Sequence, residues 1–285
     1  MKTQEGFIQT KGGKVWYEIV GNKNTIPLIA LHGGPGYPHD SLESLKDLSN
    51  EQKVIFYDQL GCGNSQRVKD KSLWTVKYFV AELQEIVKKL NLKHYHILGH
   101  SWGAALGVAF ALTKPKGLKS LILSSPYIST PHWEKDAQKL LAKLPKNMRG
   151  ALKGGKIKSK GYQKASKVFY ERYVFRTDTD KRPTAAIRAG HKMSHEIYEY
   201  MWGPEEFIVK GTLKNLDLSK RLAEIKVPTL LLCGRFDEAT PQSTEYFKSL
   251  MPNAQMKVFE KSAHMPHWTE RREYINTIRS FLRSL

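Results

Sequence analysis

Short apolar runs recur in the first and last parts of the chain, and residues that favour turns bound each of them. A continuous apolar run of this length is typical of a strand that is buried on both faces of a sheet. The runs that predict such strands lie at 27–31, 54–57, 95–98, 118–123, 227–233 and 256–259. Alternation of apolar and polar residues over 6–20, with a turn at 11–13, predicts a hairpin at the edge of the sheet.

Helical patterns separate several of these runs. Apolar residues recur at helical spacing over 79–90, small residues dominate 104–111, and the final segment 274–282 is amphipathic. Buried strands that alternate with helices indicate an α/β fold with a mostly parallel, doubly wound sheet.

Residues 127–220 differ in character from the segments around them. They are helical in pattern, basic and aromatic, and no run among them predicts a buried strand. We therefore expect a helical cap over 127–220, inserted between two parts of one sheet domain at 1–126 and 221–285.

The chain carries a formal net charge of +19, part of which is concentrated in a lysine-rich stretch over 135–167. A strongly basic chain can bind nucleic acid or an anionic membrane. However, no ladder of aromatic residues or zinc module accompanies the lysines, and arginine, the usual reader of bases, is less frequent than lysine. We expect a solvated basic surface and no nucleic-acid partner, with a basic binding protein as the alternative.

The 285 residues, of which 40% are hydrophobic, are enough for a large buried core. The longest apolar run, 105–112, is far too short to span a bilayer, and the chain begins with no apolar stretch suited to a secretory signal. We therefore expect a cytoplasmic protein without a membrane partner. Cys62 and Cys233 show no metal-binding spacing, which indicates free thiols.

The stretch 99–103 reads Gly-His-Ser-Trp-Gly, with a predicted strand before it and a predicted helix after it. In the pattern Gly-x-Ser-x-Gly, a tight strand-to-helix turn lifts the serine hydroxyl out of the backbone, and the flanking glycines leave room for the turn. This context predicts that Ser101 is a nucleophile. The alternative is a glycine-rich loop that only reverses the chain.

A serine hydroxyl needs a base within hydrogen-bond reach and a third group that orients the base. Asp237 and His264 each follow directly after a predicted strand. Side chains beyond the carboxyl ends of parallel strands meet at one edge of the sheet, so Ser101, Asp237 and His264 can converge. The alternatives are Asp237 as a helix cap, His264 as an ordinary loop residue, and His267 as the base.

The stretch 32–36 reads His-Gly-Gly-Pro-Gly and follows a predicted central strand, so its backbone can approach a ligand and offer N–H groups. It does not give the Gly-x-Gly-x-x-Gly pattern of a dinucleotide site. His191 and His195 lie four residues apart on a predicted helix, but no acidic residue follows His191 as a His-Glu-x-x-His zinc motif requires. We expect no metal.

Four motifs can be taken together, at 32–36, at 57–65 (Tyr-Asp-Gln-Leu-Gly-Cys-Gly-Asn-Ser), at 99–103 and at 203–207 (Gly-Pro-Glu-Glu-Phe). They resemble the prolyl aminopeptidase (proline iminopeptidase) family of α/β-hydrolases, and the likeness covers nearly the whole chain. Glu206 and the run 237–241 look most similar to the tricorn-interacting aminopeptidases, which release several kinds of N-terminal residue. A glycine often stands in this family where the chain has His100, so the choice between strict proline enzymes and broader ones stays open.

The resemblance implies an eight-stranded, mostly parallel sheet with helices on both faces, and a serine aminopeptidase that acts on short peptides through an acyl-enzyme. It implies that the N–H groups of Gly34 and Trp102 form the oxyanion hole, which agrees with their places after a central strand and after the nucleophile. It further implies that Glu206 and Glu238 bind the protonated amine of the substrate. We expect a monomer that requires no cofactor. An esterase or amidase with the same triad is the alternative, in which the two glutamates have no catalytic use.

Overall fold

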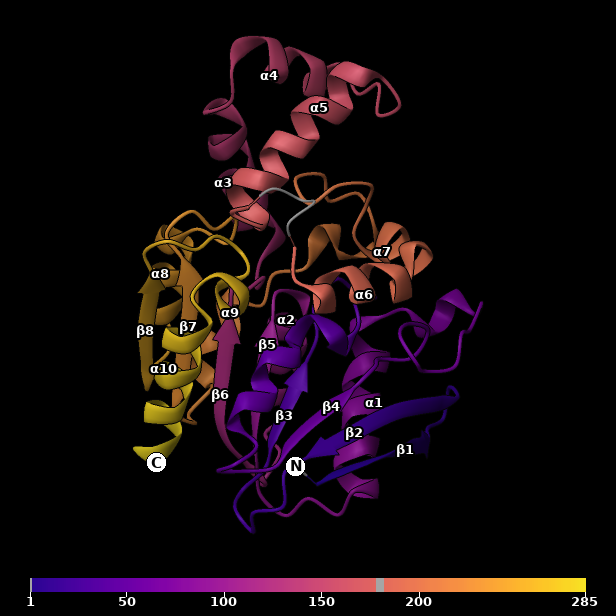
Figure 1. Cartoon of the computed structure of the whole chain (residues 1–285), viewed down its shortest axis with the longest axis vertical. Coiled ribbons are helices and arrows are strands. Elements are labelled where there is room, and N and C mark those ends of the chain that lie inside the picture. The colour runs from indigo at the N-terminus through magenta and orange to yellow at the C-terminus, as the bar shows by residue number, and fades with distance from the viewer. Residues whose placement is uncertain (1, 178–181) are drawn as a thin grey trace.

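The computed structural model describes residues 2–177 and 182–285. Its centre is an eight-stranded sheet in the order β1-β2-β4-β3-β5-β6-β7-β8 (Figure 1). The strands are β1 (Thr3–Gln9), β2 (Lys14–Val20), β3 (Leu28–Leu31), β4 (Val54–Tyr57), β5 (Tyr95–His100), β6 (Leu118–Ser124), β7 (Thr229–Gly234) and β8 (Ala254–Phe259). β2 pairs antiparallel with β1 and β4, and the other pairings are parallel. The mostly parallel α/β fold predicted from the sequence is confirmed.

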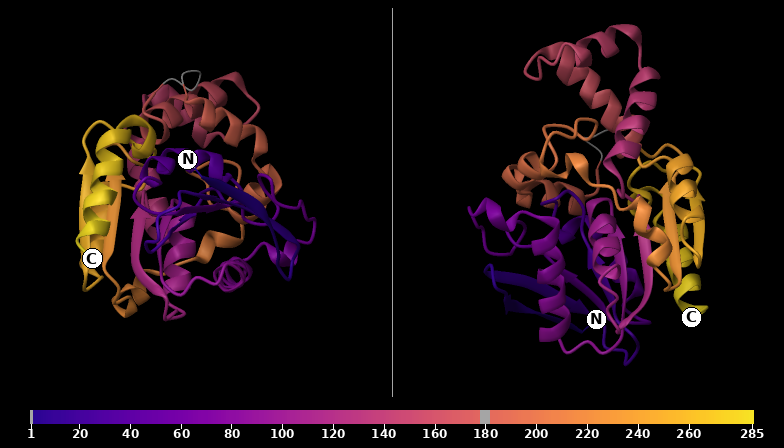
Figure 2. Two further views of the ribbon diagram at one scale, coloured as in Figure 1. Left: turned by 60° about the horizontal axis from the view of Figure 1, so that its bottom comes forward. Right: turned by 180° about the vertical axis from the view of Figure 1, so that it is seen from behind.

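Helices lie on both faces of this sheet and beyond the carboxyl ends of its strands (Figures 1 and 2). The α-helices are α1 (Val76–Lys89), α2 (Trp102–Ala111), α3 (Thr130–Ala142), α4 (Lys146–Lys153), α5 (Lys160–Phe169), α6 (Thr184–Lys192), α7 (His195–Met201), α8 (Pro241–Ser249), α9 (Pro266–Thr269) and α10 (Arg271–Arg283). 3-10 helices span His39–Leu48, Lys71–Leu73, Thr212–Asn215 and Ser219–Glu224, and a π-helix spans Tyr170–Val174. Among the described residues, no helix combines the length and the apolar character needed to cross a bilayer.

The continuous apolar strands are explained by the two cores on either side of the sheet. In β3, Ile29 and Leu31 belong to the core that α1 and α2 cover. Leu28 and Ala30 belong to the opposite core, which α10 and the 3-10 helix His39–Leu48 cover. All four side chains of β3 are therefore buried. A strand with helices on both faces has no solvated side, so apolar residues are needed at every position.

Helices α3 to α7, here called the cap helices, come between β6 and β7 in the chain and lie above the carboxyl ends of the strands (Figure 1). α4 and α5 project furthest from the sheet in Figure 1 and in the right view of Figure 2. An apolar cluster of their own joins α3, α5 and the π-helix to Phe207, and it reaches Met265 in the loop after β8. The division at residues 127 and 220 stays a prediction.

Candidate active site

Ser101 lies in a sharp turn between β5 and α2, with φ 54° and ψ −118°. Such a conformation is strained for a residue with a Cβ and is typical of functional turns. A Cβ on Gly99 would lie 2.1 Å from the carbonyl oxygen of Gly103, and a Cβ on Gly103 would lie 2.1 Å from that of Leu31. Only glycine leaves room on both sides, which explains the Gly-x-Ser-x-Gly pattern.

His264 and Asp237 come from the loops after the neighbouring strands β8 and β7. Nδ1 of His264 lies 2.7 Å from Oδ1 of Asp237, and both side chains are buried. The carboxylate also accepts hydrogen bonds from the backbone N–H groups of Gly234, at 3.2 Å, and Ala239, at 2.8 Å. Asp237 is thus fixed as an acceptor, which places a proton on Nδ1 of His264 and leaves Nε2 able to accept one. His264 and Ser101 line one cavity of about 350 Å³.

His100, the residue before the serine, holds the loop that carries His264. Its Nε2 atom lies 2.8 Å from the carbonyl oxygen of His264, and the Ser125 hydroxyl donates to the same oxygen at 2.9 Å. Burial holds the pKa of His100 well below its usual value, so the ring is neutral and donates through Nε2. The ring of His267, the alternative base, packs against the ring of His100. The carboxylate of Asp237 instead accepts a hydrogen bond from His264, so His264 is the histidine with an orienting acid.

The glycine loop 32–36 lies directly against the serine turn. A Cβ on Gly33 would lie 3.3 Å from the Cβ of Ser101. Gly34 has φ +104°, a region that favours glycine, and it lines the same cavity as Ser101. Trp102 is the first residue of α2. The two predicted oxyanion donors therefore belong to segments that adjoin the serine from different parts of the chain.

Gln59 connects the glycine loop to the serine turn, a role that sequence reasoning missed. Its side-chain oxygen accepts the indole N–H of Trp102 at 2.8 Å, and its side-chain amide donates to the carbonyl of His32 at 3.1 Å. The backbone N–H of Gln59 donates to Nε2 of His32 at 2.9 Å. Burial lowers the pKa of His32 to about 4, so its ring accepts this bond in the neutral form. The Asp-Gln-x-Gly-x-Gly motif is visible in the sequence, but it does not indicate which residues the side chain of Gln59 contacts.

Glu206 and Glu238 are two carboxylic acids close to His264. Glu206 lines the cavity, and Oε1 of the buried Glu238 lies 3.9 Å from Nδ1 of His264. Within the described part of the chain, neither oxygen of Glu238 has a hydrogen-bond partner. Burial, and then the charge of Glu206, raise the pKa of Glu238 well above its usual value, and burial also raises the pKa of Glu206. Burying two neighbouring carboxylic acids costs free energy of folding. A bound cation would offset this cost by pairing with their carboxylates.

Tyrosines from the cap helices and the π-helix form another part of the cavity wall. Tyr170 and Tyr198 both line it, and burial raises the pKa of each well above its usual value, with the charge of Glu206 as the next cause. The Tyr170 hydroxyl accepts the backbone N–H of Glu206 at 3.3 Å. The sequence shows the aromatic character of 127–220, but the packing decides which of its rings reach the cavity.

His191 and His195 do not share a helix, so that prediction is wrong. α6 ends at Lys192, and α7 begins at His195. The Ser194 side chain caps α7 by accepting the backbone N–H of Ile197, which explains the break. Across the part of the chain that the structure describes, no group of three or more His, Cys, Asp and Glu side chains could hold a metal ion.

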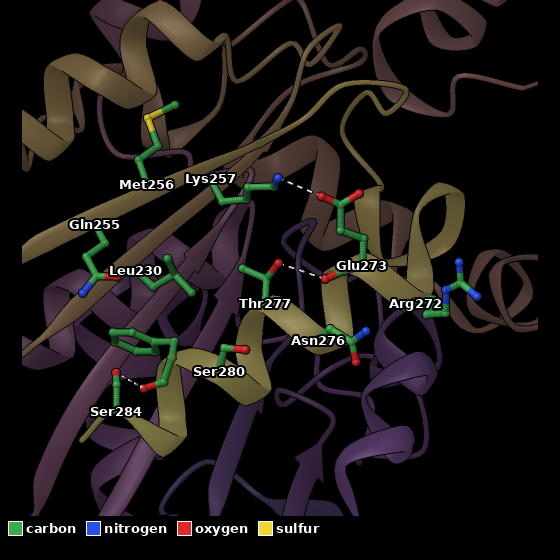
Figure 3. A pocket seen from close by; sticks show the side chains of 11 residues that line it. Leu230, Gln255, Met256, Lys257, Arg272, Glu273, Asn276, Thr277, Ser280 and Ser284 are labelled. Atoms are coloured by element: carbon green, nitrogen blue, oxygen red, sulfur yellow. Dashed lines mark hydrogen bonds and ion pairs between the residues drawn. The ribbon is translucent and has the colours of Figure 1, made fainter.

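A larger hollow of about 740 Å³ lies between β8 and α10 (Figure 3). It shares no lining residue with the cavity at Ser101. Its charged groups satisfy one another in part, because Lys257 forms an ion pair with Glu273 at 2.7 Å, and the Thr277 hydroxyl donates to the backbone of Glu273. The described residues that line it include no histidine or cysteine, whereas the smaller cavity holds both Ser101 and His264, so the smaller cavity is the candidate active site.

Residues 26–271 match the family described as the alpha/beta hydrolase fold. Together with the sheet order and the serine turn after β5, this match makes the chain an α/β-hydrolase. The chain is 46% identical to a proline iminopeptidase of Heyndrickxia coagulans and 37% identical to one of Clostridium botulinum. Each alignment covers 99% of this chain and 99% of the relative. The crystal structure of a proline iminopeptidase from Mycobacterium smegmatis, 32% identical, covers 99% of this chain and 98% of its own with a TM-score of 0.92. The chain belongs to the proline iminopeptidase family, as its motifs predicted.

Proposed function

We propose that this protein is a serine aminopeptidase that releases an N-terminal proline, or another small apolar residue, from short peptides. The observation that carries the proposal is that Glu206 lines the cavity together with Ser101 and His264, while Oε1 of the buried Glu238 lies 3.9 Å from Nδ1 of His264. Relatives named proline iminopeptidase, matched over almost their whole length, support it.

In this proposal, Ser101 attacks the carbonyl carbon of the N-terminal residue while Nε2 of His264 takes the hydroxyl proton. The backbone N–H groups of Gly34 and Trp102 stabilise the charge that develops on the carbonyl oxygen. The carbon–nitrogen bond then breaks, His264 gives its proton to the leaving amine, and an ester remains on Ser101. Water attacks the ester with His264 as base, and the free amino acid leaves. Asp237 stabilises the imidazolium in both steps.

The two glutamates select for a free N-terminus. Carboxylates on both sides of one ammonium place the amine at a fixed distance from Ser101, so only the first peptide bond reaches the nucleophile. Burial raises the pKa of Glu206 and of Glu238, and an incoming cation favours their charged forms again. A neutral acyl group in the same place gains none of this attraction.

We also propose that the protein works in the cytoplasm as a monomer, without a metal or cofactor, and that its lysine-rich stretch 135–167 is a solvated surface. We keep residues 127–220 as a cap that limits the length of peptide admitted. The position of α3 to α7 above the carboxyl ends of the strands supports this last point (Figure 1).

The test compares two substrates that differ only at the amine. Proline para-nitroanilide carries a protonated amine, and its N-acetyl derivative does not. We expect kcat/KM to be about a hundredfold larger for the free amine, because the acetyl group brings no cation to Glu206 and Glu238. A short-chain nitrophenyl ester is the control. Equal cleavage of the two anilides, with faster hydrolysis of the ester, would contradict the aminopeptidase and favour an esterase.

A further inference from the structure

Two aromatic side chains hold the backbone of Glu206, one at its carbonyl oxygen and one at its N–H group. The indole N–H of Trp133, in α3, donates to the carbonyl oxygen at 2.8 Å. The hydroxyl of Tyr170, in the π-helix, accepts the N–H of Glu206 at 3.3 Å. Both backbone polar groups of Glu206 therefore have partners from other segments, and these partners fix the point from which its side chain starts.

The ring of Trp133 also packs against the imidazole of His264. The two ring centroids lie 5.9 Å apart and the planes are inclined by 83°, which is an edge-to-face contact. Trp133 is 5% exposed and is not among the described residues that line the cavity, whereas Glu206 and His264 both line it. One side chain thus connects the proposed base to the backbone of the proposed amine-binding acid, and it acts on a substrate only through them.

Two further aromatic rings hold the indole of Trp133 in place. The ring of Tyr127 packs against it with centroids 5.8 Å apart, and the ring of Trp202 with centroids 5.3 Å apart, both edge to face. Side chains that are packed this closely in a core keep one rotamer, so the indole N–H of Trp133 keeps its direction. Trp202 makes the same kind of bond one residue earlier, because its indole N–H donates to the carbonyl oxygen of Glu205 at 3.0 Å.

We propose that Trp133 is a positioning residue that holds Glu206 in a fixed place relative to His264 and so makes hydrolysis depend on a free substrate amine. The inference rests on the proposed aminopeptidase function and deepens it by naming the residue that fixes the amine site. Catalysis needs the reacting groups in a productive geometry, and a small displacement of a group that binds the substrate lowers the rate strongly. If Glu206 shifts away from His264, the amine shifts with it, and the carbonyl carbon of the first residue moves away from Ser101.

The experiment uses Trp133→Phe, which removes the indole N–H and keeps an aromatic ring. It measures kcat/KM for proline para-nitroanilide, which carries the amine, and for para-nitrophenyl acetate, which does not. In the proposed chemistry both substrates need Ser101 and His264, so the ratio of anilide to ester reports on the amine site. We expect this ratio to fall about tenfold, because the backbone of Glu206 loses one hydrogen bond. A merely structural role would lower both rates together and leave the ratio unchanged.

Trp202→Phe is the matched control. It removes the same kind of bond from Glu205, which is not among the described residues that line the cavity. Its ratio of anilide to ester should stay within about twofold of the wild-type ratio. A second variant replaces Trp133 by benzothienylalanine, which has a sulfur atom in place of the N–H group and keeps the shape of the indole. This variant preserves the packing of the core, and its ratio should fall as in Trp133→Phe.

A wild-type ratio in both variants of Trp133 would overturn the proposal, and so would an equal fall of the ratio in Trp202→Phe. In each of these results the wild type still prefers the free amine to its N-acetyl derivative, so the proposed aminopeptidase function stands. Failure of that function looks different, because the wild type itself would then cleave the two anilides equally well. The role of Trp133 at the amine site would fall with it.

Discussion

The Nε2 atom of His100 lies 2.8 Å from the backbone carbonyl oxygen of His264, so the residue before the candidate nucleophile is bonded to the candidate base. The rings of the two histidines are also in contact, with centroids 4.9 Å apart. This bond crosses from the end of β5 to the loop after β8. His100 is therefore a positioning residue for the imidazole of His264.

We expect His100→Ala to lower kcat about tenfold while KM changes little, because the carbonyl oxygen of His264 loses one of the two hydrogen bonds that it accepts. His100→Gln should recover part of the loss, since its amide can donate in place of Nε2. Steady-state kinetics with proline para-nitroanilide measures both values. A variant that loses thermal stability but keeps the wild-type kcat would show that His100 has only a structural role.

Glu206 and Glu205 are neighbours with different surroundings, which makes them a matched pair. Glu206 lines the cavity, whereas Glu205 accepts a hydrogen bond from the Ser166 hydroxyl at 3.1 Å. Glu206→Gln should lower kcat/KM about tenfold to a hundredfold, because a hydrogen bond to a charged group contributes about 1.5–3 kcal/mol. Glu205→Gln should change it by less than about twofold. Similar losses in the two variants would refute the assignment of the amine to Glu206.

Glu82, in α1, is a buried carboxyl that the proposed mechanism does not use. It accepts the backbone N–H of Leu60 at 3.1 Å and the Tyr78 hydroxyl at 3.4 Å, and burial raises its pKa from 4.5 to about 8. Because the pKa is higher in the folded state, the folded protein keeps a proton that the unfolded chain releases as the pH rises from about 4.5 to about 8. The free energy of unfolding therefore falls as the pH rises through this window.

Glu82→Gln should remove this fall, because a neutral amide keeps an acceptor for Leu60 and carries no charge at any pH. At the upper end of the window, the gain in the free energy of unfolding has an upper limit of roughly 5 kcal/mol. Calorimetric Tm values from about pH 5 to 8 check this for both proteins. We expect the difference in Tm between variant and wild type to grow with pH, and a constant difference would count against a buried Glu82 charge.

Much of the fold could be predicted because parallel strands with helices on both faces need apolar residues throughout. β3 shows this directly, since Leu28 and Ile29 point into opposite cores and neither side can be polar. The nearness of Asp237 and His264 could be expected from the chain order, because β7 and β8 are adjacent parallel strands whose carboxyl ends share an edge.

Other features depend on packing that no local pattern records. Arg182 is one of 46 lysines and arginines, and nothing in the residues around it marks it as part of the cavity wall. Glu82 lies in an amphipathic helix, where an acidic residue is usually solvated, and it is buried because the loop at Leu60 covers it. The break between His191 and His195 depends on a serine cap, which competes with continuation of the helix.

The most direct test of the proposed chemistry measures the release of nitroaniline from proline para-nitroanilide by the wild type and by Ser101→Ala. We expect the variant to fold with an unchanged circular dichroism spectrum and to lose at least about a thousandfold in kcat, because alanine has no hydroxyl with which to form the acyl-enzyme. A kcat close to that of the wild type would contradict the role of Ser101 as the nucleophile.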